Sequence, residues 1–317
     1  TQMKATGEVM GIDRSFEAAL QKAVRSLEMG NRPLLWEDKT WDHQSEDEGS
    51  SIRLDPNDLR IWALMATLRR GVSPEDVSRT TGIDPWFTNK LNNLVNMEKV
   101  LLGESLTPSL MRRAKRLGFS DEDIATLADR LPEQVRNLRQ EWNIKPVYKM
   151  VDTCAAEFAA QTPYFYSTYE QENEAEPIPG KRALVIGSGP IRIGQGIEFD
   201  YCSVHAAWAL DSEGVNSIMV NSNPETVSTD FDTSNRLYFE PLDEESIRDI
   251  IDNEKGSSVG DDETSISTVL QFGGQTAINL AGPLHRSQIP ILGSSSDTID
   301  IAEDRHRFED FLNLLGI

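Results

Sequence analysis

Cysteine is scarce in this sequence of 317 residues, which contains only Cys154 and Cys202. The two are far apart and form no Cys-x-x-Cys pair, so neither a disulfide framework nor a structural zinc site is expected. Histidine is almost as rare, with four residues scattered along the chain. A metal site built from histidines is therefore not expected either.

Long apolar runs are also lacking. No stretch approaches the roughly 20 apolar residues of a membrane span, and the opening TQMKATGEVM lacks the apolar core of a signal peptide. Basic residues are the minority, with 31 Lys and Arg against 52 Asp and Glu and a formal net charge of -21. This balance argues against a protein whose main ligand is nucleic acid. We expect a soluble, cytoplasmic protein with neither a membrane nor a nucleic acid as its partner.

The length fits about two domains, and a composition of 38% hydrophobic and 26% charged residues is that of a globular protein. Residues 53–150 carry 16 basic and 13 acidic side chains, so the acidic excess lies elsewhere in the chain. We interpret the acidic runs as solvated surface.

The first half of the chain is helical in pattern. In residues 1–30, apolar residues recur at helical spacing from Phe16 to Leu27, with Ser15 as the candidate N-cap. Residues 31–52 are rich in Asp, Glu and Ser, which predicts a linker. Residues 53–163 form a predicted helical domain.

That helical domain contains an internal repeat. GVSPEDVSRTTGIDPWFTNKL, from Gly71, aligns without gaps to GFSDEDIATLADRLPEQVRNL, from Gly118. Ser73 and Ser120 are predicted N-caps with an acidic residue at the capping-box position, and Pro74, Pro85 and Pro132 fit first-turn positions. The repeat predicts a helix-turn-helix pair that is used twice. Such a pair could enter a DNA groove, but its second helices offer few basic side chains, which favours helix packing or subunit contact.

The pattern changes in the second half. Residues 164–182 are polar and contain prolines, which predicts a connector. In residues 183–317, short apolar runs such as ALVIGSG and SIMVNSN alternate with helical stretches. This alternation predicts βαβ units and a parallel sheet, with loops at the carboxyl ends of the strands forming a crevice.

Those loops hold the candidate chemistry. The loop at 187–196, GSGPIRIGQG, is rich in glycine, but Arg192 stands where a dinucleotide fingerprint needs glycine, and no Gly-Lys-Ser/Thr follows for a Walker loop. Arg192, Glu198 and Asp200 stand close together, although acids at a helix start could simply complement its dipole. With the polar runs at 221–232 and 271–279, three polar strand ends lie on one sheet edge and favour a lined cavity. His205 and both cysteines are interpreted as packed side chains and not as catalytic groups.

The motifs RIGQGIEFDYCSVHAA, MVNSNPETVSTDFDTSNRLYFEPL, LQFGGQTAINLA and ILGSSSDTIDIAEDRHRF resemble the large chain of carbamoyl-phosphate synthetase, at the pre-ATP-grasp domain of its second synthetase half. The resemblance implies a multi-domain fold with an all-α oligomerisation domain and a Rossmann-like α/β pre-ATP-grasp domain. It also implies that residues 1–30 end the first ATP-grasp domain and that the chain is an internal fragment, inactive by itself.

The resemblance further implies a ligase that makes carbamoyl phosphate from bicarbonate, glutamine-derived ammonia and two ATP. Its partners would be a glutaminase small subunit and further copies bound through the helical domain. ATP and Mg or Mn would bind at ATP-grasp sites outside this fragment. Carbamate decomposes in water, so it would need a walled passage between two sites. Carried over by position, Glu8, Arg192, Glu198 and Glu225 would line that passage, and no catalytic or metal-binding residue is assigned.

Two other interpretations stay open from the residues. The glycine-rich strand end allows a dinucleotide-binding dehydrogenase, which Arg192 disfavours. The helical repeat allows a module that works only through protein or DNA contacts. The family resemblance implies an enzyme that serves arginine or pyrimidine synthesis.

Overall fold

The structure is a computed structural model that describes residues 8–27, 32–41, 52–190, 198–256 and 266–317. The chain divides into two compact units. One unit comprises residues 13–145 and the other comprises residues 1–12 together with 146–317. We call them the helical unit and the α/β unit and describe each by itself.

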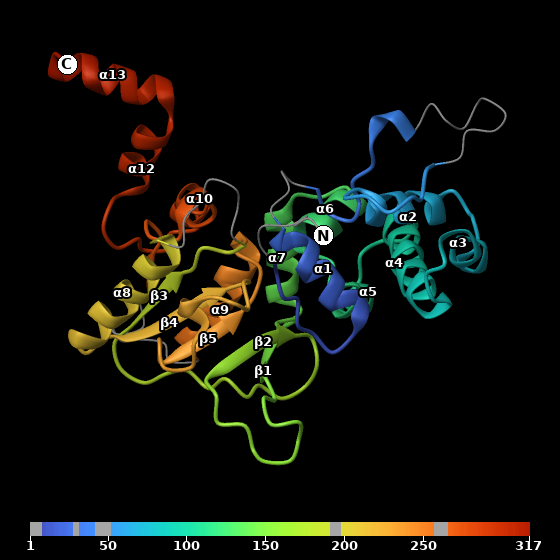
Figure 1. Ribbon diagram of the computed structural model, residues 1–317, viewed down its shortest axis with the longest axis horizontal. Coiled ribbons are helices and arrows are strands. Elements are labelled where there is room, and N and C mark those ends of the chain that lie inside the picture. The colour runs from blue at the N-terminus through green and yellow to red at the C-terminus, as the bar shows by residue number, and fades with distance from the viewer. Residues whose placement is uncertain (1–7, 28–31, 42–51, 191–197, 257–265) are drawn as a thin grey trace, which may run out of the picture. The chain divides into compact units, whose positions relative to one another are not determined.

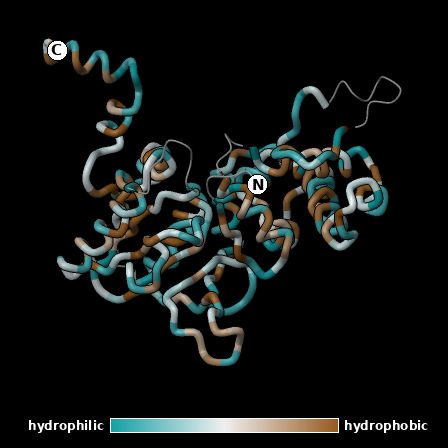
Figure 2. Tube along the Cα trace, viewed as in Figure 1, coloured by the Kyte–Doolittle hydropathy of each residue, from teal (hydrophilic) through white to brown (hydrophobic). Residues whose placement is uncertain are grey.

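The helical unit consists of seven described helices, drawn from blue to green in Figure 1. They are α1 (Phe16–Ser26), α2 (Arg60–Arg69), α3 (Pro74–Thr81), α4 (Pro85–Gly103), α5 (Pro108–Arg116), α6 (Asp121–Leu127) and α7 (Pro132–Glu141). The long helix α4 packs against α1, α2, α3 and α6. Buried and exposed residues alternate along α4, and Figure 2 shows the hydropathy changing along the helices of this unit.

The predicted helix starts are confirmed. The hydroxyl oxygens of Ser15, Ser73 and Ser120 accept hydrogen bonds from the N–H groups of Ala18, Asp76 and Asp123, which satisfies donors that a helix start leaves free. Ser120 and Asp123 form a complete capping box. Proline opens α3, α4 and α7, where its missing N–H removes no helical hydrogen bond.

The internal repeat is confirmed as two helix-turn-helix pairs, α3 with α4 and α6 with α7. Each repeat begins at a glycine in the left-handed region, with φ of +87° at Gly71 and +88° at Gly118. The two glycines differ in their surroundings. A Cβ at Gly71 would meet no atom within 4 Å, whereas a Cβ at Gly118 would lie 2.7 Å from the Cα of Ala18. Gly118 therefore also allows α1 to approach the turn that follows α5.

The α/β unit is built on a six-stranded sheet in the order β1-β2-β5-β4-β3-β6. The strands are β1 (Val147–Met150), β2 (Tyr164–Thr168), β3 (Arg182–Ile186), β4 (Asn216–Asn221), β5 (Arg236–Phe239) and β6 (Ser267–Val269). Only β1 runs antiparallel to its neighbour, β2, and the other pairings are parallel. The predicted parallel sheet is thus confirmed.

Helices pack on both faces of this sheet. Buried residues of α9 (Glu244–Lys255), α10 (Gly274–Asn279) and α11 (Ala281–Arg286) join one core cluster, which includes Ile186, Ile218 and Val220 of the strands. Residues of α8 (Glu198–Ser212) join a second cluster around Val185, Met219 and Leu237. Because successive strand residues point to opposite faces, Val185 and Ile186 serve different clusters. Two covered faces explain why residues 183–186 of β3 and residues 218–220 of β4 are apolar.

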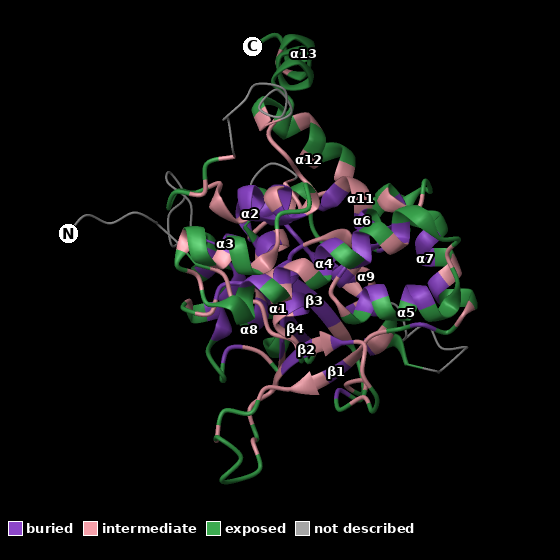
Figure 3. Cartoon of the chain, turned by 90° about the vertical axis from the view of Figure 1, so that its right-hand side faces the viewer, coloured by how far each residue is buried: buried purple, intermediate pink, exposed green. Residues whose placement is uncertain are grey.

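Two regions differ from the simple pattern. Strand β1 lies within residues 53–163, where the sequence predicted a helical domain, and β2 lies within residues 164–182, where it predicted a connector. They are short, and an edge pair that is flanked by polar residues gives a weak hydrophobic signal. At the other end, α12 (Ser296–Glu303) and α13 (Arg305–Leu315) contain no buried residue, as the colours in Figure 3 show.

Candidate functional site

The carboxyl ends of β3 and β4 are joined through one buried amide. The side-chain oxygen of Asn221 accepts hydrogen bonds from the N–H groups of Gly189, Ser222 and Asn223, at 3.1, 2.8 and 3.2 Å. Its side-chain nitrogen donates to the hydroxyl of Ser228 at 3.0 Å. Asn221 is fully buried. It therefore fixes the loops that follow both strands relative to one another.

Glycine is required where these strand ends meet. A Cβ at Gly187 would lie 2.6 Å from the side-chain nitrogen of Asn221. A Cβ at Gly273, which follows β6, would lie 2.5 Å from the carbonyl oxygen of Gly187. Both glycines are thus explained by the close approach of three strand ends. This packing gives the loop after β3 a structural reason for glycine and does not favour the dinucleotide-binding interpretation.

Asp200 anchors α8 to this edge. It is 2% exposed, and its carboxylate accepts hydrogen bonds from the N–H and the hydroxyl of Ser228 in the short 3₁₀ helix η2 (Val227–Thr229). The side chain is therefore committed to structure. The sequence interpretation of Asp200 as an acid that complements the helix dipole had not identified this role.

The segment at 8–12 reaches the same edge from far away in the sequence. The N–H of Met10 donates to the carbonyl oxygen of Ser222 at 2.9 Å, and the side chains of Met10 and Ile12 pack against the cluster around Val185. Glu8 is thereby placed beside Glu225, whose own N–H donates to the side-chain oxygen of Asn223 at 3.0 Å. Backbone contacts from two distant segments thus bring two carboxyl groups together.

The two carboxyl groups form the clearest electrostatic feature of the edge. The negative charge of Glu225, together with a hydrogen bond between the two side chains, raises the pKa of Glu8 above its ordinary value. A hydrogen bond between two carboxyl groups requires a proton on one of them. In the pH range where one of the two groups holds a proton, the pair can present a donor and an acceptor at one place. Both side chains are exposed in this chain.

The remaining predicted passage residues are placed as follows. Glu198 is the first residue of α8 and is exposed, and no hydrogen bond joins it to Glu8 or Glu225 among the described residues. Arg192 lies outside the described residues. Of the four predicted side chains, the structure therefore brings two together, sets Glu198 at the start of the helix that Asp200 anchors, and leaves the position of the fourth as a prediction.

The prediction that His205 and Cys202 are packed side chains is wrong. α8 buries Ser203, Val204 and Ala207 against the sheet, so its opposite face carries Cys202 and His205 to the surface. His205 lies between the rings of Tyr201 and Trp208, with ring centroids 4.3 and 5.3 Å away. The apolar residues next to His205 misled the interpretation, because alanine occurs on both faces of this helix, with Ala207 buried and Ala209 exposed. Cys154 is half-buried.

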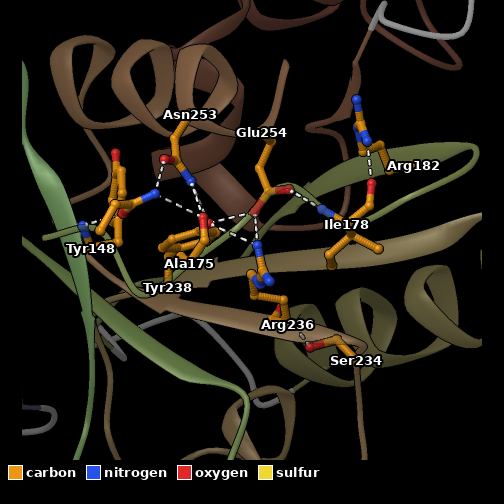
Figure 4. Close-up of polar contacts among 10 residues, drawn as sticks. Tyr148, Ala175, Ile178, Arg182, Ser234, Arg236, Tyr238, Asn253 and Glu254 are labelled. Carbon is orange, nitrogen blue, oxygen red and sulfur yellow. Dashed lines mark hydrogen bonds and ion pairs between the residues drawn. The ribbon is translucent and has the colours of Figure 1, made fainter. Parts of the chain in front are cut away.

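A second polar cluster lies inside the α/β unit (Figure 4). The buried carboxylate of Glu254 in α9 accepts hydrogen bonds from Tyr238 and Arg236 of β5 and from the N–H of Ile178. Burial and the charge of Glu254 raise the pKa of the Tyr238 hydroxyl. Asn253 donates to the carbonyl oxygen of Ala175 at 3.0 Å. The cluster fastens the segment before β3 to α9, and its groups are occupied by one another.

The described residues offer no group of three or more His, Cys, Asp or Glu side chains placed to hold a metal ion. Within the same residues, none of the helices has the length and apolar character needed to cross a membrane.

Comparison with known proteins gives the same organisation. A family model for the carbamoyl-phosphate synthetase large chain oligomerisation domain matches residues 8–143, and one for the carbamoyl phosphate synthase preATP-grasp domain matches residues 179–301. The chain is 57% identical over 317 residues to the carbamoyl phosphate synthase large chain of Thermomicrobium roseum, covering 100% of this chain and 29% of that protein.

Similar relatives occur in other organisms. The corresponding large chains of Methanothrix thermoacetophila and Archaeoglobus fulgidus are 49% and 47% identical over 323 and 324 residues, again covering 100% of this chain and 29% of each relative. The chain therefore spans less than a third of the length of these curated relatives. Because the two family models and these identities extend over both units, the chain belongs to the carbamoyl-phosphate synthetase large-chain family.

Proposed function

We propose that this chain is part of the large chain of a glutamine-hydrolysing carbamoyl-phosphate synthetase. The whole enzyme would be a ligase that makes carbamoyl phosphate from bicarbonate, glutamine-derived ammonia and two ATP. The high identity to relatives named as this large chain supports the proposal. Within it, we assign residues 8–143 to the oligomerisation domain, in agreement with the matching family model, and residues 183–317 to the pre-ATP-grasp domain of the second half.

The α/β unit would line the passage that carries carbamate between two phosphorylation sites. The observation that carries this assignment is the pairing of Glu8 with Glu225 at the carboxyl edge of the sheet. Carbamate has a carboxylate that accepts hydrogen bonds and an amino group that donates them. A carboxyl pair that shares one proton matches both ends, because the protonated member donates and the charged member accepts.

Glu198 and Arg192 extend this proposal along the same edge. Glu198 is the first residue of α8, the helix that Asp200 ties to η2, so it is held at the carboxyl edge of the sheet that also carries Glu225. An arginine at position 192 would offer a forked donor to the carboxylate of carbamate. These two roles rest on the family resemblance and on chain position.

ATP and its metal ion belong to other parts of the large chain in this proposal. The described residues hold no acidic cluster able to bind Mg or Mn, and the glycines at 187 and 273 are occupied by close backbone packing. When bound elsewhere, ATP supplies the phosphoryl group for each activation. The residues of this chain would bind and pass on the intermediate and exclude water from it.

The helical unit would provide contacts between subunits. Its description as an oligomerisation domain in the matching family supports association of large chains through it. We further propose a glutaminase small subunit as the source of ammonia and a cytoplasmic location, and we describe the α/β unit as Rossmann-like because parallel strands alternate with helices on both faces.

The experiment uses the full-length large chain with its small subunit. Glu225→Lys would replace an acceptor with a cation beside Glu8. We expect each phosphorylation, measured by itself, to stay within about twofold of the unchanged enzyme, while carbamoyl phosphate formed per ATP consumed falls about tenfold or more. Glu213→Lys, at an exposed glutamate after α8, is the matched control. Undiminished coupling in Glu225→Lys would refute the passage role.

A further inference from the structure

Two buried hydroxyl groups at the carboxyl edge of the sheet have no hydrogen-bond partner. Ser188, two residues past the end of β3, is 8% exposed, and Ser222, the first residue past the end of β4, is 1% exposed. No other side-chain hydroxyl among the described residues is buried without a partner. We call Ser188 and Ser222 the hydroxyl pair. Because buried polar groups in proteins are almost always hydrogen-bonded, the pair requires an explanation.

The two serines occupy equivalent positions on neighbouring strands. In the parallel pairing of β3 with β4, Ile186 lies opposite Val220, and the N–H of Gly187 donates to the carbonyl oxygen of Val220 at 2.8 Å. Two residues further along each strand, the same register places Ser188 opposite Ser222. Since neighbouring strands lie about 4.8 Å apart, the two serines are close neighbours.

The backbone around both serines is fixed by other hydrogen bonds. The N–H of Ser222 donates to the side-chain oxygen of Asn221 at 2.8 Å, and its carbonyl oxygen accepts from the N–H of Met10 at 2.9 Å. Gly189, which follows Ser188, donates its N–H to the same side-chain oxygen of Asn221. This framework holds the two strand ends together without using either hydroxyl.

A third serine at the same edge shows what a structural hydroxyl does here. Ser228 is fully buried, and its hydroxyl donates to the carboxylate of Asp200 and accepts from the side-chain nitrogen of Asn221. Burying a hydroxyl without such partners costs free energy, because its hydrogen bonds to water are lost. Alanine would avoid this cost at positions 188 and 222. Serine at both positions therefore indicates a ligand that supplies the missing partners.

The hydroxyl pair suits a small molecule that carries both donors and acceptors. A serine hydroxyl donates one hydrogen bond and accepts up to two. Carbamate presents two carboxylate oxygens as acceptors and an amino group as a donor, so it can bond with both hydroxyls at once. The hydroxyls are uncharged and bind an anion less tightly than an arginine does. Weak binding suits a site that has to release its ligand again.

Burial distinguishes the hydroxyl pair from the carboxyl pair of Glu8 and Glu225. Both carboxyl groups are exposed in this chain, whereas both hydroxyls are shielded from solvent. The two pairs are linked through the backbone, because Met10, which binds Ser222, lies two residues after Glu8. Carbamate has to be kept from water. The hydroxyl pair therefore offers an environment for it that the carboxyl pair does not.

We propose that Ser188 and Ser222 form a binding site for carbamate, in which the two hydroxyls hold it by hydrogen bonds between the two phosphorylation steps. The inference rests on the proposed function and gives a role to two residues that this function left unassigned. To admit carbamate, the ends of β3 and β4 would move slightly apart. The new hydrogen bonds would then offset the cost of burying the two hydroxyls.

The test is the double variant Ser188→Ala with Ser222→Ala in the full-length large chain with its small subunit. We expect carbamoyl phosphate formed per ATP consumed to fall about fivefold or more, because two hydrogen bonds to the intermediate are lost. Each phosphorylation measured by itself should stay within about twofold of the unchanged enzyme. An unaltered yield of carbamoyl phosphate would overturn the proposal.

Hydrogen exchange of peptides that cover the ends of β3 and β4 separates binding from a structural role. The double variant breaks no hydrogen bond within the protein, so its exchange should be unchanged or slower. Ser228→Ala breaks the bond to Asp200 and should exchange faster. If the double variant exchanges faster as Ser228→Ala does, the hydroxyls have a structural role and the proposal is wrong.

Ser217→Ala is the matched control for the yield. It removes a buried hydroxyl near the amino end of β4, far along the strand from Ser222, and should leave the yield within about twofold. An equal loss in this control would also contradict the proposal. The result is separate from that of Glu225→Lys. Reduced coupling in Glu225→Lys with an unaltered double serine variant would refute only the hydroxyl site, and the reverse would refute only the role of the carboxyl pair.

Discussion

Asp200, in the first turn of α8, accepts hydrogen bonds from both the backbone N–H and the hydroxyl of Ser228 in η2. One carboxylate thus holds together two elements that meet at the functional edge. The residue lies close to Glu198 in sequence but plays a different part, because it points into the protein and Glu198 lies at the surface.

Removing this carboxylate should loosen the edge. In Asp200→Ala, the N–H of Ser228 loses its charged acceptor, and we expect the local free energy of opening to fall by about 2 kcal/mol. Hydrogen exchange of peptides that cover η2 and the start of α8 measures the change. Asp211→Ala, an exposed acid on the same helix, should leave exchange unaltered. Equal exchange in both variants would show that the Asp200 contact does not stabilise the edge.

Two equivalent glycines of the internal repeat provide a matched pair of variants. Gly71 and Gly118 both have φ near +90°, so alanine at either position incurs the cost of a left-handed residue, about 1 kcal/mol. At Gly118 the new Cβ would also lie 2.7 Å from the Cα of Ala18, and such overpacking costs about 1 to 3 kcal/mol more.

We therefore expect Gly118→Ala to destabilise the helical unit clearly more than Gly71→Ala does, by about 1 kcal/mol at least. Urea denaturation that is followed by the circular dichroism of the helices measures the difference. Equal losses in the two variants would mean that α1 moves away from the turn after α5 without cost.

Much of the helical unit could be predicted from the sequence because its signals are local. The hydroxyls of Ser73 and Ser120 cap helices through hydrogen bonds to N–H groups only three residues later in the sequence. Pro85 and Pro132 mark helix starts directly. The alternation in residues 183–317 likewise predicted a parallel sheet, since each βα unit is local in sequence.

The rest of the fold and site depended on distant contacts. The edge strand β1 pairs with β2 across a loop, and the backbone of Met10 binds that of Ser222. Neither partnership leaves a periodic signal in the sequence. Only the family resemblance grouped Glu8 with Glu225, because the residues around Glu8 carry no pattern that identifies which side chain it contacts. Asn221 and Asp200 were missed as anchors for the same reason. The prediction of His205 as a packed side chain was wrong because apolar residues occur on both faces of α8.

The proximity of Glu8 and Glu225 predicts a specific pH dependence. The charge of Glu225 raises the pKa of Glu8 above its ordinary value of 4.5. Because the folded protein then holds this proton more tightly than the unfolded chain does, the contribution of Glu8 to stability is present at pH values below 4.5 and is lost as pH rises through the higher folded value. The contribution of Glu8 to stability is therefore largest in acidic solution, below pH 4.5.

Removing the charge of the partner should restore ordinary behaviour. In Glu225→Gln, the titration midpoint of Glu8, followed by carbon-13 NMR of its carboxyl group, should fall toward its ordinary value of 4.5. Glu213→Gln removes an exposed charge at the end of α8 and should leave the raised midpoint in place. If the midpoint of Glu8 is the same in the unchanged protein and in Glu225→Gln, the two side chains do not share a proton. The carboxyl pair could then not offer a donor and an acceptor to one ligand, and the part of the passage proposal that depends on the pair would fail with it.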